Sequence, residues 1–215
     1  MNGLALAHPS LTPAAAASLA LFALVSSITP GPNNLMLASS GLTFGFRRTM
    51  PHMLGITLGL MAMLVLVGCG LGAVFVQWPP AYSLLKVAGS AYLLYLAWRV
   101  ARSGPMTADT AAGRPFTFLQ AAAFQWVNPK AWIMSVGIVA AYTPQSGFYV
   151  NLMLAAAICG AVTLPSISLW TACGSALRHA LRTPSAVRAF NLAMALLLVA
   201  SLYPALRDTL TGVLP

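Results

Sequence analysis

Two short stretches combine helix-breaking residues with amide side chains inside long apolar runs. The first is Pro30-Gly31-Pro32-Asn33-Asn34, and the second is Gln125 followed by Asn128-Pro129-Lys130. Proline lacks a backbone N–H and crowds the preceding turn, so each stretch should interrupt its helix. An interruption leaves backbone donors and acceptors unpaired, and Asn and Gln side chains add more of both. These groups are suited to binding a small zwitterion.

Lys130 adds a cation to the second stretch. It is the only charged residue near the middle of any expected membrane span, where an ionisable group is costly and is by default a functional candidate. Because no expected span contains a carboxylate, the amine must reach water, lose its proton or pair with an anion from outside the protein. We therefore predict that Lys130 couples proton uptake to the binding of a substrate carboxylate. The alternative is a side chain whose long stem extends into a hydrated vestibule.

The composition indicates an all-α integral membrane protein. Of the 215 residues, 59% are hydrophobic and only 6% are charged, and the mean hydropathy is +0.83. No soluble domain of this size could bury so much apolar surface, so the chain should lie in a lipid bilayer. The net charge of +9 comes from 11 Lys and Arg against two Asp. These cations fall mainly in short loops, so membrane topology explains them and we expect no nucleic-acid partner.

The apolar runs predict six transmembrane helices, at about 14–42, 51–77, 81–100, 117–142, 148–172 and 187–206. The polar loop 103–116 divides them into a first repeat, 1–102, and a second repeat, 117–215. The first and fourth helices carry the breaks, so the two halves would cross the membrane in opposite senses. This is the pattern of a 3+3 inverted-topology repeat whose broken helices meet near the bilayer midplane. Two kinks without a ligand are the alternative.

Local signals refine these boundaries. Gly45-Phe46-Arg47-Arg48 predicts a tight basic loop, 173–186 predicts another, and Gly55-x-x-x-Gly59 predicts close helix packing. The basic residues follow the first, third and fifth spans, so the positive-inside rule places those loops in the cytoplasm and both termini outside. No Lys or Arg precedes the first apolar run, so we interpret it as a span rather than a signal peptide.

Helix starts at the two breaks would create an anion site. Asn128 before Pro129 predicts an N-cap followed by proline at the first helical position, and Gly31-Pro32 could open a second half-helix. Because helix N-termini attract anions, we expect substrate binding at Pro30, Gly31, Pro32, Asn33, Asn34, Gln125, Asn128, Pro129 and Lys130. Asn33 or Asn34 could instead cap the half-helix, and Gln125 could form only an interhelical hydrogen bond.

Catalytic and metal-binding functions have little support in the sequence. An enzyme would need an acid–base pair or a metal cluster, and His8, His52 and His179 are widely spaced with no carboxylate nearby. An exporter of metal ions would need oxygen or thiolate ligands in its spans, and Cys69 and Cys159 are single residues. We therefore expect no enzyme, no cofactor and no bound metal.

These motifs resemble the LysE/RhtB superfamily of bacterial amino-acid exporters. The residues that carry the resemblance are Thr29-Pro30-Gly31-Pro32-Asn33-Asn34, Gly45-Phe46-Arg47, Gly55-x-x-x-Gly59, Ala88-Gly89-x-Ala91-Tyr92-Leu93, Leu96-Ala97-Trp98 and Phe124-Gln125-x-x-Asn128-Pro129-Lys130. The Thr-Pro-Gly-Pro-Asn-Asn form and the Phe-Gln-Trp-Val-Asn run are closest to members described as cysteine and O-acetylserine exporters.

The resemblance implies export of amino acids or close relatives across the inner membrane by a secondary transporter, driven by the proton gradient. It leaves export of another small solute as the alternative, and it leaves a homo-oligomer open. The chain departs from the family in acidity, because some members use Asp residues and none of the spans expected here contains Asp or Glu.

Overall fold

The computed structural model of the protein describes residues 11–71, 73, 77–102, 114–181 and 183–201. Within these ranges the chain forms eight α-helices and no strand, which confirms the all-helical expectation. The helices are α1 (Pro13–Ile28), α2 (Pro32–Phe44), α3 (Phe46–Leu66), α5 (Pro79–Ala101), α6 (Phe118–Phe124), α7 (Pro129–Tyr142), α8 (Phe148–Ala180) and α9 (Pro184–Ala200). A π-helical turn, Val67–Leu71, extends α3, and a 3-10 turn, Gln125–Val127, follows α6.

Prolines act here mainly as helix starts. Helices α1, α2, α5, α7 and α9 each begin at a proline, where the missing N–H costs nothing and the fixed φ suits the helix. The side chains of Thr12, Asn128 and Thr183 cap the first turns of α1, α7 and α9. In contrast, α3 and α8 continue through Pro51 and Pro165.

Both predicted breaks are present. Helices α1 and α2 form a pair bent by 57° at Thr29–Gly31. In the fourth apolar run, α6 ends at Phe124 and the chain restarts as α7 after the extended residue Asn128, with φ −88° and ψ 109°. This second break begins at Gln125, earlier than the sequence indicated, because a 3-10 turn tightens the end of α6.

The two loop predictions at the basic segments are wrong. Gly45 alone turns the chain, with φ 81°, so Phe46, Arg47 and Arg48 belong to the first turn of α3. A glycine can adopt this left-handed conformation and reverse the chain in one residue. Similarly, α8 continues to Ala180, so most of the expected loop 173–186 is helical. Arginine side chains can extend to water from the last turn of a helix. The arginines in these two segments were therefore no sign that the helix had ended.

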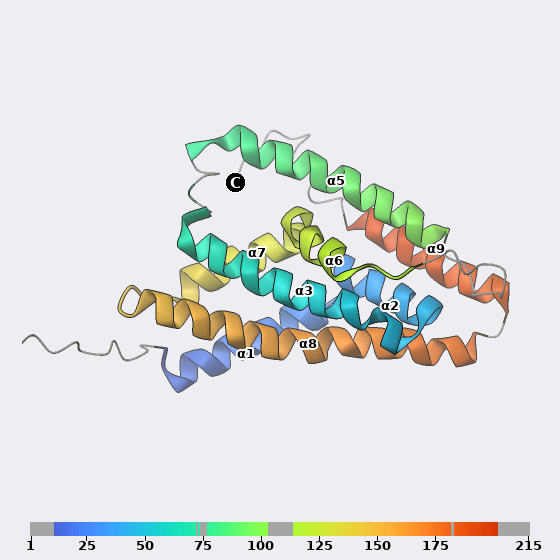
Figure 1. The fold of residues 1–215 in the computed structure, drawn as a ribbon, viewed down its shortest axis with the longest axis horizontal. Coiled ribbons are helices and arrows are strands. Elements are labelled where there is room, and N and C mark those ends of the chain that lie inside the picture. Colours follow the sequence, from blue (N-terminus) through green and yellow to red (C-terminus); the bar gives the residue numbers. More distant parts are fainter. Residues whose placement is uncertain (1–10, 72, 74–76, 103–113, 182, 202–215) are drawn as a thin grey trace, which may run out of the picture.

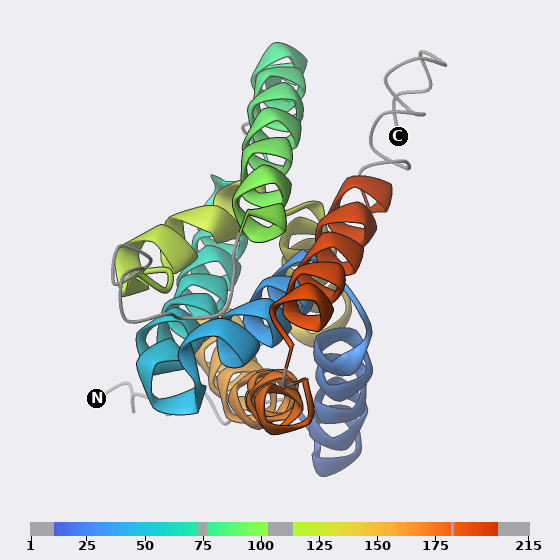
Figure 2. The same cartoon turned by 90° about the vertical axis from the view of Figure 1, so that its right-hand side faces the viewer.

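Helix α8 runs along one side of the bundle and packs against α1, α2 and α3, whereas α5 packs chiefly on α9 (Figures 1 and 2). Helices α3 and α6 approach closely, since a Cβ on Gly55 would lie 2.3 Å from the carbonyl oxygen of Phe118. A buried cluster between α2, α3, α6 and α8 contains Leu37, Met53, Ile56, Ala121 and Ile167. This packing brings both broken segments against the middle of α3 and α8.

The outer surface of the bundle is apolar. Leu119 and Ile133 are 75% and 72% exposed, as expected for side chains that face lipid. Two segments, Phe46–Leu71 and Phe148–Arg178, are long and apolar enough to cross a membrane, and the bent α1–α2 pair would make a third. Helix α9 is apolar but shorter. The six-span arrangement and its inverted repeat therefore stay predictions.

The arginine-bearing segments gather at one end of the bundle. The α2–α3 turn, the end of α5, the end of α8 and the start of α9 all lie at the right in Figure 1. We call this the basic end. This clustering agrees with the prediction that the basic loops follow alternate spans. Residues 103–113 of the expected loop 103–116 and the end of the sixth span at 206 lie outside the described residues.

We expect Gly55→Ala to destabilise the protein, because its added Cβ would meet a backbone oxygen that cannot move alone. Overpacking of this kind costs about 1–3 kcal/mol. Thermal unfolding of the purified protein in detergent measures the loss. Gly137→Ala is the matched control, since a Cβ at this helical glycine of α7 meets no atom of the described part of the chain within 4 Å. Equal unfolding temperatures for the two variants would contradict the close packing of α3 and α6.

Candidate functional site

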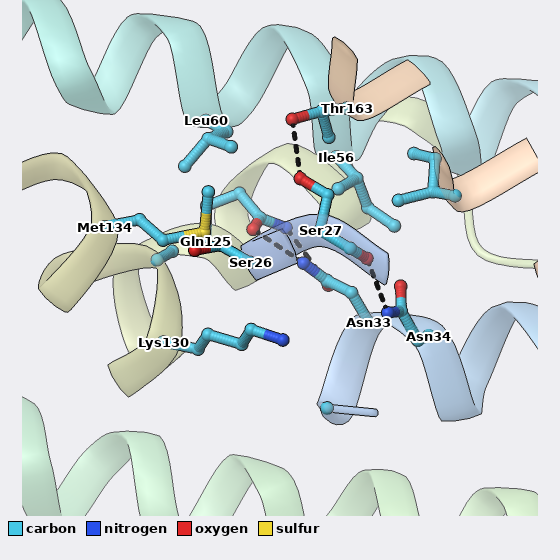
Figure 3. Close-up of a pocket in the computed structure, with 13 residues that line it drawn as sticks. Ser26, Ser27, Asn33, Asn34, Ile56, Leu60, Gln125, Lys130, Met134 and Thr163 are labelled. Atoms are coloured by element: carbon cyan, nitrogen blue, oxygen red, sulfur yellow. Dashed lines mark hydrogen bonds between the residues drawn. The ribbon is translucent and has the colours of Figure 1, made fainter. Parts of the chain in front are cut away.

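A pocket lies between the two interrupted helices (Figure 3). Its empty volume, counted with its open mouth, is about 370 Å³. Of the residues predicted to bind substrate, those that line it are Gly31, Asn33, Asn34, Gln125 and Lys130. The other predicted residues, Pro30, Pro32, Asn128 and Pro129, shape the breaks and do not line the pocket. The wall also contains residues that were not among the predicted binding residues, namely Ser26, Ser27, Ile56, Leu60, Ala131, Met134, Thr163 and Ile167.

Side chains satisfy every backbone carbonyl at the broken end of α1. The helix stops at Ile28, so the carbonyls of residues 26–29 lack intrahelical partners. The donors that replace these partners are Thr29 Oγ1 to Ser26 O (3.1 Å), Asn34 Nδ2 to Ser27 O (2.7 Å) and to Thr29 O (2.8 Å), Trp170 Nε1 to Ile28 O (3.0 Å), and Lys130 Nζ to Thr29 O (2.9 Å). The break is therefore held open by groups from α2, α7 and α8.

Lys130 finds a partner that the sequence did not suggest. Its amine donates to the carbonyl oxygen and to the hydroxyl of Thr29, each at 2.9 Å. The C-terminal end of α1 carries the negative end of the helix dipole, so it takes the place of a carboxylate. The half-buried stem crosses Gly31, where a Cβ would lie 3.1 Å from Lys130 Cδ and 3.2 Å from Nζ. The amine thus lies directly beside the start of α2.

The two asparagines have different roles, and neither caps α2. Asn34 is only 3% exposed, and its amide donors are taken by the α1 carbonyls. Asn33 forms a reciprocal pair with Gln125, Nδ2 to Oε1 at 2.9 Å and Nε2 to Oδ1 at 3.3 Å. Gln125 also donates to Ala121 O at 2.8 Å. The interhelical hydrogen bond of Gln125 is therefore confirmed, and it joins the first broken segment to the second.

The N-termini of α7 and α2 differ in what they offer a ligand. The predicted N-cap Asn128 is confirmed, since its Oδ1 accepts from Lys130 N at 3.1 Å and its carbonyl accepts from Ala131 N. Helix α7 therefore satisfies its first-turn donors itself, contrary to the free N–H groups expected there. Gly31 caps α2 without a side chain, and the N–H groups of Asn33 and Asn34 have no capping partner among the described residues. Only the α2 end remains open to an anion.

A hydroxyl pair closes the opposite wall of the pocket. Ser27 Oγ and Thr163 Oγ1 lie 3.0 Å apart and are buried (Figure 3). The residues are 136 positions apart in the chain, so no local spacing could have linked them. The available signal was a hydroxyl residue in the otherwise apolar run just before Pro165. No group of three or more His, Cys, Asp or Glu that could hold a metal ion occurs in the described ranges.

A pocket that combines polar side chains with an apolar wall, set between two interrupted helices in an apolar bundle, is typical of a membrane transporter. The family model for the LysE type translocator matches residues 24–201, and the chain belongs to this family. The resemblance seen in the sequence motifs is therefore confirmed.

Relatives support the same class. The cysteine/O-acetylserine efflux proteins of Escherichia coli (strain K12) and Shigella sonnei (strain Ss046) are each 31% identical over 194 residues, which cover 88% of this chain and 96% of the relative. The cysteine/O-acetylserine efflux protein of Escherichia coli O139:H28 (strain E24377A / ETEC) is 35% identical over 134 residues, 62% of this chain and 67% of the relative. No solved structure matches the chain. The family and these names indicate a transporter rather than an enzyme.

We expect Asn34→Asp to destabilise the fold, because an acceptor oxygen would replace the donor that faces Ser27 O and Thr29 O. Each unsatisfied buried group costs about 1–3 kcal/mol. Thermal unfolding in detergent checks this, with Asn33→Asp as the control. The carboxylate of Asn33→Asp can still accept from Gln125, so its loss should be smaller. A wild-type unfolding temperature for Asn34→Asp would show that the α1 end needs no donor there.

Proposed function

We propose that the protein is a secondary active transporter that exports small amino acids or their derivatives across the bacterial inner membrane, driven by the proton gradient. Membership of the LysE type translocator family and the efflux names of the relatives support an exporter. The proposed substrate class depends on one observation, namely that the Lys130 amine lies in the pocket beside the start of α2, which no described side chain caps.

The substrate carboxylate binds between Lys130 Nζ and the first-turn N–H groups of α2. The positive end of the helix dipole and the ammonium both favour an anion there. A hydrogen bond between two charged groups is also stronger than a neutral one. The chain contains no Glu and only two Asp, and neither Asp lies in the described residues, so no acidic side chain among the pocket residues competes for Lys130.

The rest of the pocket suits the remainder of a small amino acid. The hydroxyls of Ser27 and Thr163 and the oxygen of Asn33 provide acceptors for a substrate ammonium. Ile56, Leu60 and Met134 provide an apolar wall for a short side chain. Methionine adapts readily to different shapes, which favours a group of related substrates over a single one. The relatives named for cysteine and O-acetylserine make these two compounds the first probes.

The proposed transport cycle uses the two broken helices. The repeats 1–102 and 117–215 form six spans in a 3+3 inverted arrangement, with the basic end in the cytoplasm and both termini outside. Substrate binding brings a carboxylate to Lys130 and so favours its charged form, so the protonation state of this residue is linked to substrate binding. The hydrogen bonds from Lys130 to the α1 end and from Asn33 to Gln125 tie the two breaks together, and the bond from Asn34 to the α1 end closes the first break.

Counterflow in proteoliposomes tests the proposal directly. Liposomes loaded with unlabelled O-acetylserine, cysteine or another amino acid from a panel should accumulate the labelled compound for at least one member. Metal ions and non-zwitterionic solutes serve as comparison substrates. Counterflow of none of the amino acids would refute the proposed function.

Lys130→Met should weaken substrate binding and abolish gradient-driven export. Removing one charge-assisted bond costs about 1.5–3 kcal/mol, or roughly tenfold to a hundredfold in affinity. Lys130→Arg should retain part of the binding and lose proton coupling, because guanidinium stays protonated. Counterflow and a pH-sensitive dye inside the liposomes measure the two properties. Normal export by Lys130→Met would leave Lys130 with a structural role only.

The double change Pro30→Ala/Pro32→Ala should insert into the membrane and fail to export. A continuous helix would restore its own hydrogen bonds and withdraw the carbonyls and N–H groups that line the pocket. Pro184→Ala is the control, because it changes the first residue of α9, which is not a pocket residue. Both proteins are compared for membrane yield and for counterflow. Wild-type counterflow by the double variant would count against a functional break.

A further inference from the structure

His52 is a buried ionisable group that the pocket does not use. It lies on α3 and is 1% exposed, and neither Nδ1 nor Nε2 has a hydrogen-bond partner among the residues that the structure describes. An unpaired buried polar atom typically costs free energy, and most native structures avoid it. The imidazole has two such atoms, so a histidine that only fills space here lowers the stability of the fold relative to an apolar side chain of similar size.

The position of His52 relates it to the pocket. Ile56, one turn further along α3, lines the pocket, so His52 lies about 6 Å beyond it along the helix axis, toward the basic end. On the other side, Thr49 precedes His52 by one turn, and its hydroxyl lies 3.0 Å from Ser40 Oγ. His52 is therefore placed between the pocket and a buried hydroxyl pair.

One aromatic ring covers the imidazole. Phe116 stacks on His52 with ring centroids 5.2 Å apart, and it belongs to the non-helical segment that precedes α6. The guanidinium of Arg99, at the end of α5, lies 5.3 Å from the Phe116 ring centroid. The Phe116 ring thus contacts both His52 and the guanidinium of Arg99 at the basic end.

We propose that His52 is a proton-transfer site between the substrate pocket and the basic end, with Phe116 as its removable cover. The proposal rests on the proposed proton-driven export. The lone pair of one ring nitrogen accepts a proton from water on the pocket side, and the N–H of the other nitrogen releases its proton to water at the basic end. No bond other than these N–H bonds changes, and imidazole is the side chain whose unperturbed pKa lies nearest neutrality.

The cations around His52 favour a residue that passes a proton on over one that retains it. Arg48 is one turn away on α3, Arg99 lies beyond Phe116, and Arg178 of α8 is near Gly45. Helices α2 and α6 contribute no titratable side chain, and Lys130 lies on the pocket side. A positive charge on the imidazole would be repelled by these cations, so a proton that reaches His52 is passed on.

The test compares His52→Gln with the wild type in proteoliposomes, using labelled O-acetylserine, cysteine and the amino-acid panel as probes. We expect His52→Gln to keep counterflow, which needs no net proton movement, and to lower substrate-dependent proton movement by about a hundredfold. Thr43→Val is the matched control, because it removes another buried polar atom that has no partner within the described ranges, on a side chain that does not titrate near neutral pH. This control should keep both properties.

Each result decides a different point. No counterflow by the wild type would overturn the proposed function and this inference together. Normal proton movement in His52→Gln would overturn only the role of His52. Wild-type counterflow without proton movement would overturn the proposed proton coupling and the role of His52, and would leave the exporter itself in place. Equal loss of counterflow and proton movement in His52→Gln would assign the residue to packing.

A second variant leaves His52 in place. Phe116→Ala should uncover the imidazole and raise the substrate-independent proton leak of the proteoliposomes, measured with the same dye. Leu119→Ala changes a 75% exposed residue of the adjoining α6 and controls for general loosening of the membrane. A leak in Phe116→Ala no larger than in this control would overturn the covering role and the proposed route.

Discussion

The constraint on which the structure depends is the hydrogen bonding of the backbone at the first break. A helix that stops at Ile28 inside an apolar bundle leaves four carbonyls that lipid cannot satisfy. Side chains of Thr29, Asn34, Lys130 and Trp170 donate to all of them. Three of these four donors come from other helices, so the break also specifies how α2, α7 and α8 pack around the end of α1.

On the other side of the break, the start of α2 keeps its backbone N–H groups unpaired within the described part of the chain, in contrast to the end of α1. Gly31 occupies the N-cap position of α2 without a side chain that could bond to the first-turn N–H groups, and it leaves room for the Lys130 stem to cross the break. The amine therefore satisfies the α1 carbonyl end and places a positive charge beside the unpaired N–H groups of α2. A half-buried cation can be held in this way by a pocket whose described lining includes no carboxylate, because helix ends carry partial charges of both signs.

The second break has a different physical role. Asn128 and the backbone satisfy the start of α7, and Gln125 extends from the preceding 3-10 turn to Asn33. The two breaks are thus linked by an amide pair rather than by two open helix ends facing a ligand. A change in the distance between them requires this pair and the Lys130 bond to break or shift together.

The sequence alone determined the helical class, the two interruptions, the N-cap at Asn128 and most of the polar groups in the pocket. These depend on local rules, since proline starts or stops a helix wherever it occurs and an apolar run of this length favours a membrane span. Only the tertiary structure decided that Asn34 closes α1 and that Lys130 pairs with Thr29. It alone also showed that Ser27 meets Thr163 and that Phe116 covers His52. Each of these contacts depends on how helices pack side by side, and a one-dimensional pattern of residue types carries no information on which helix faces meet.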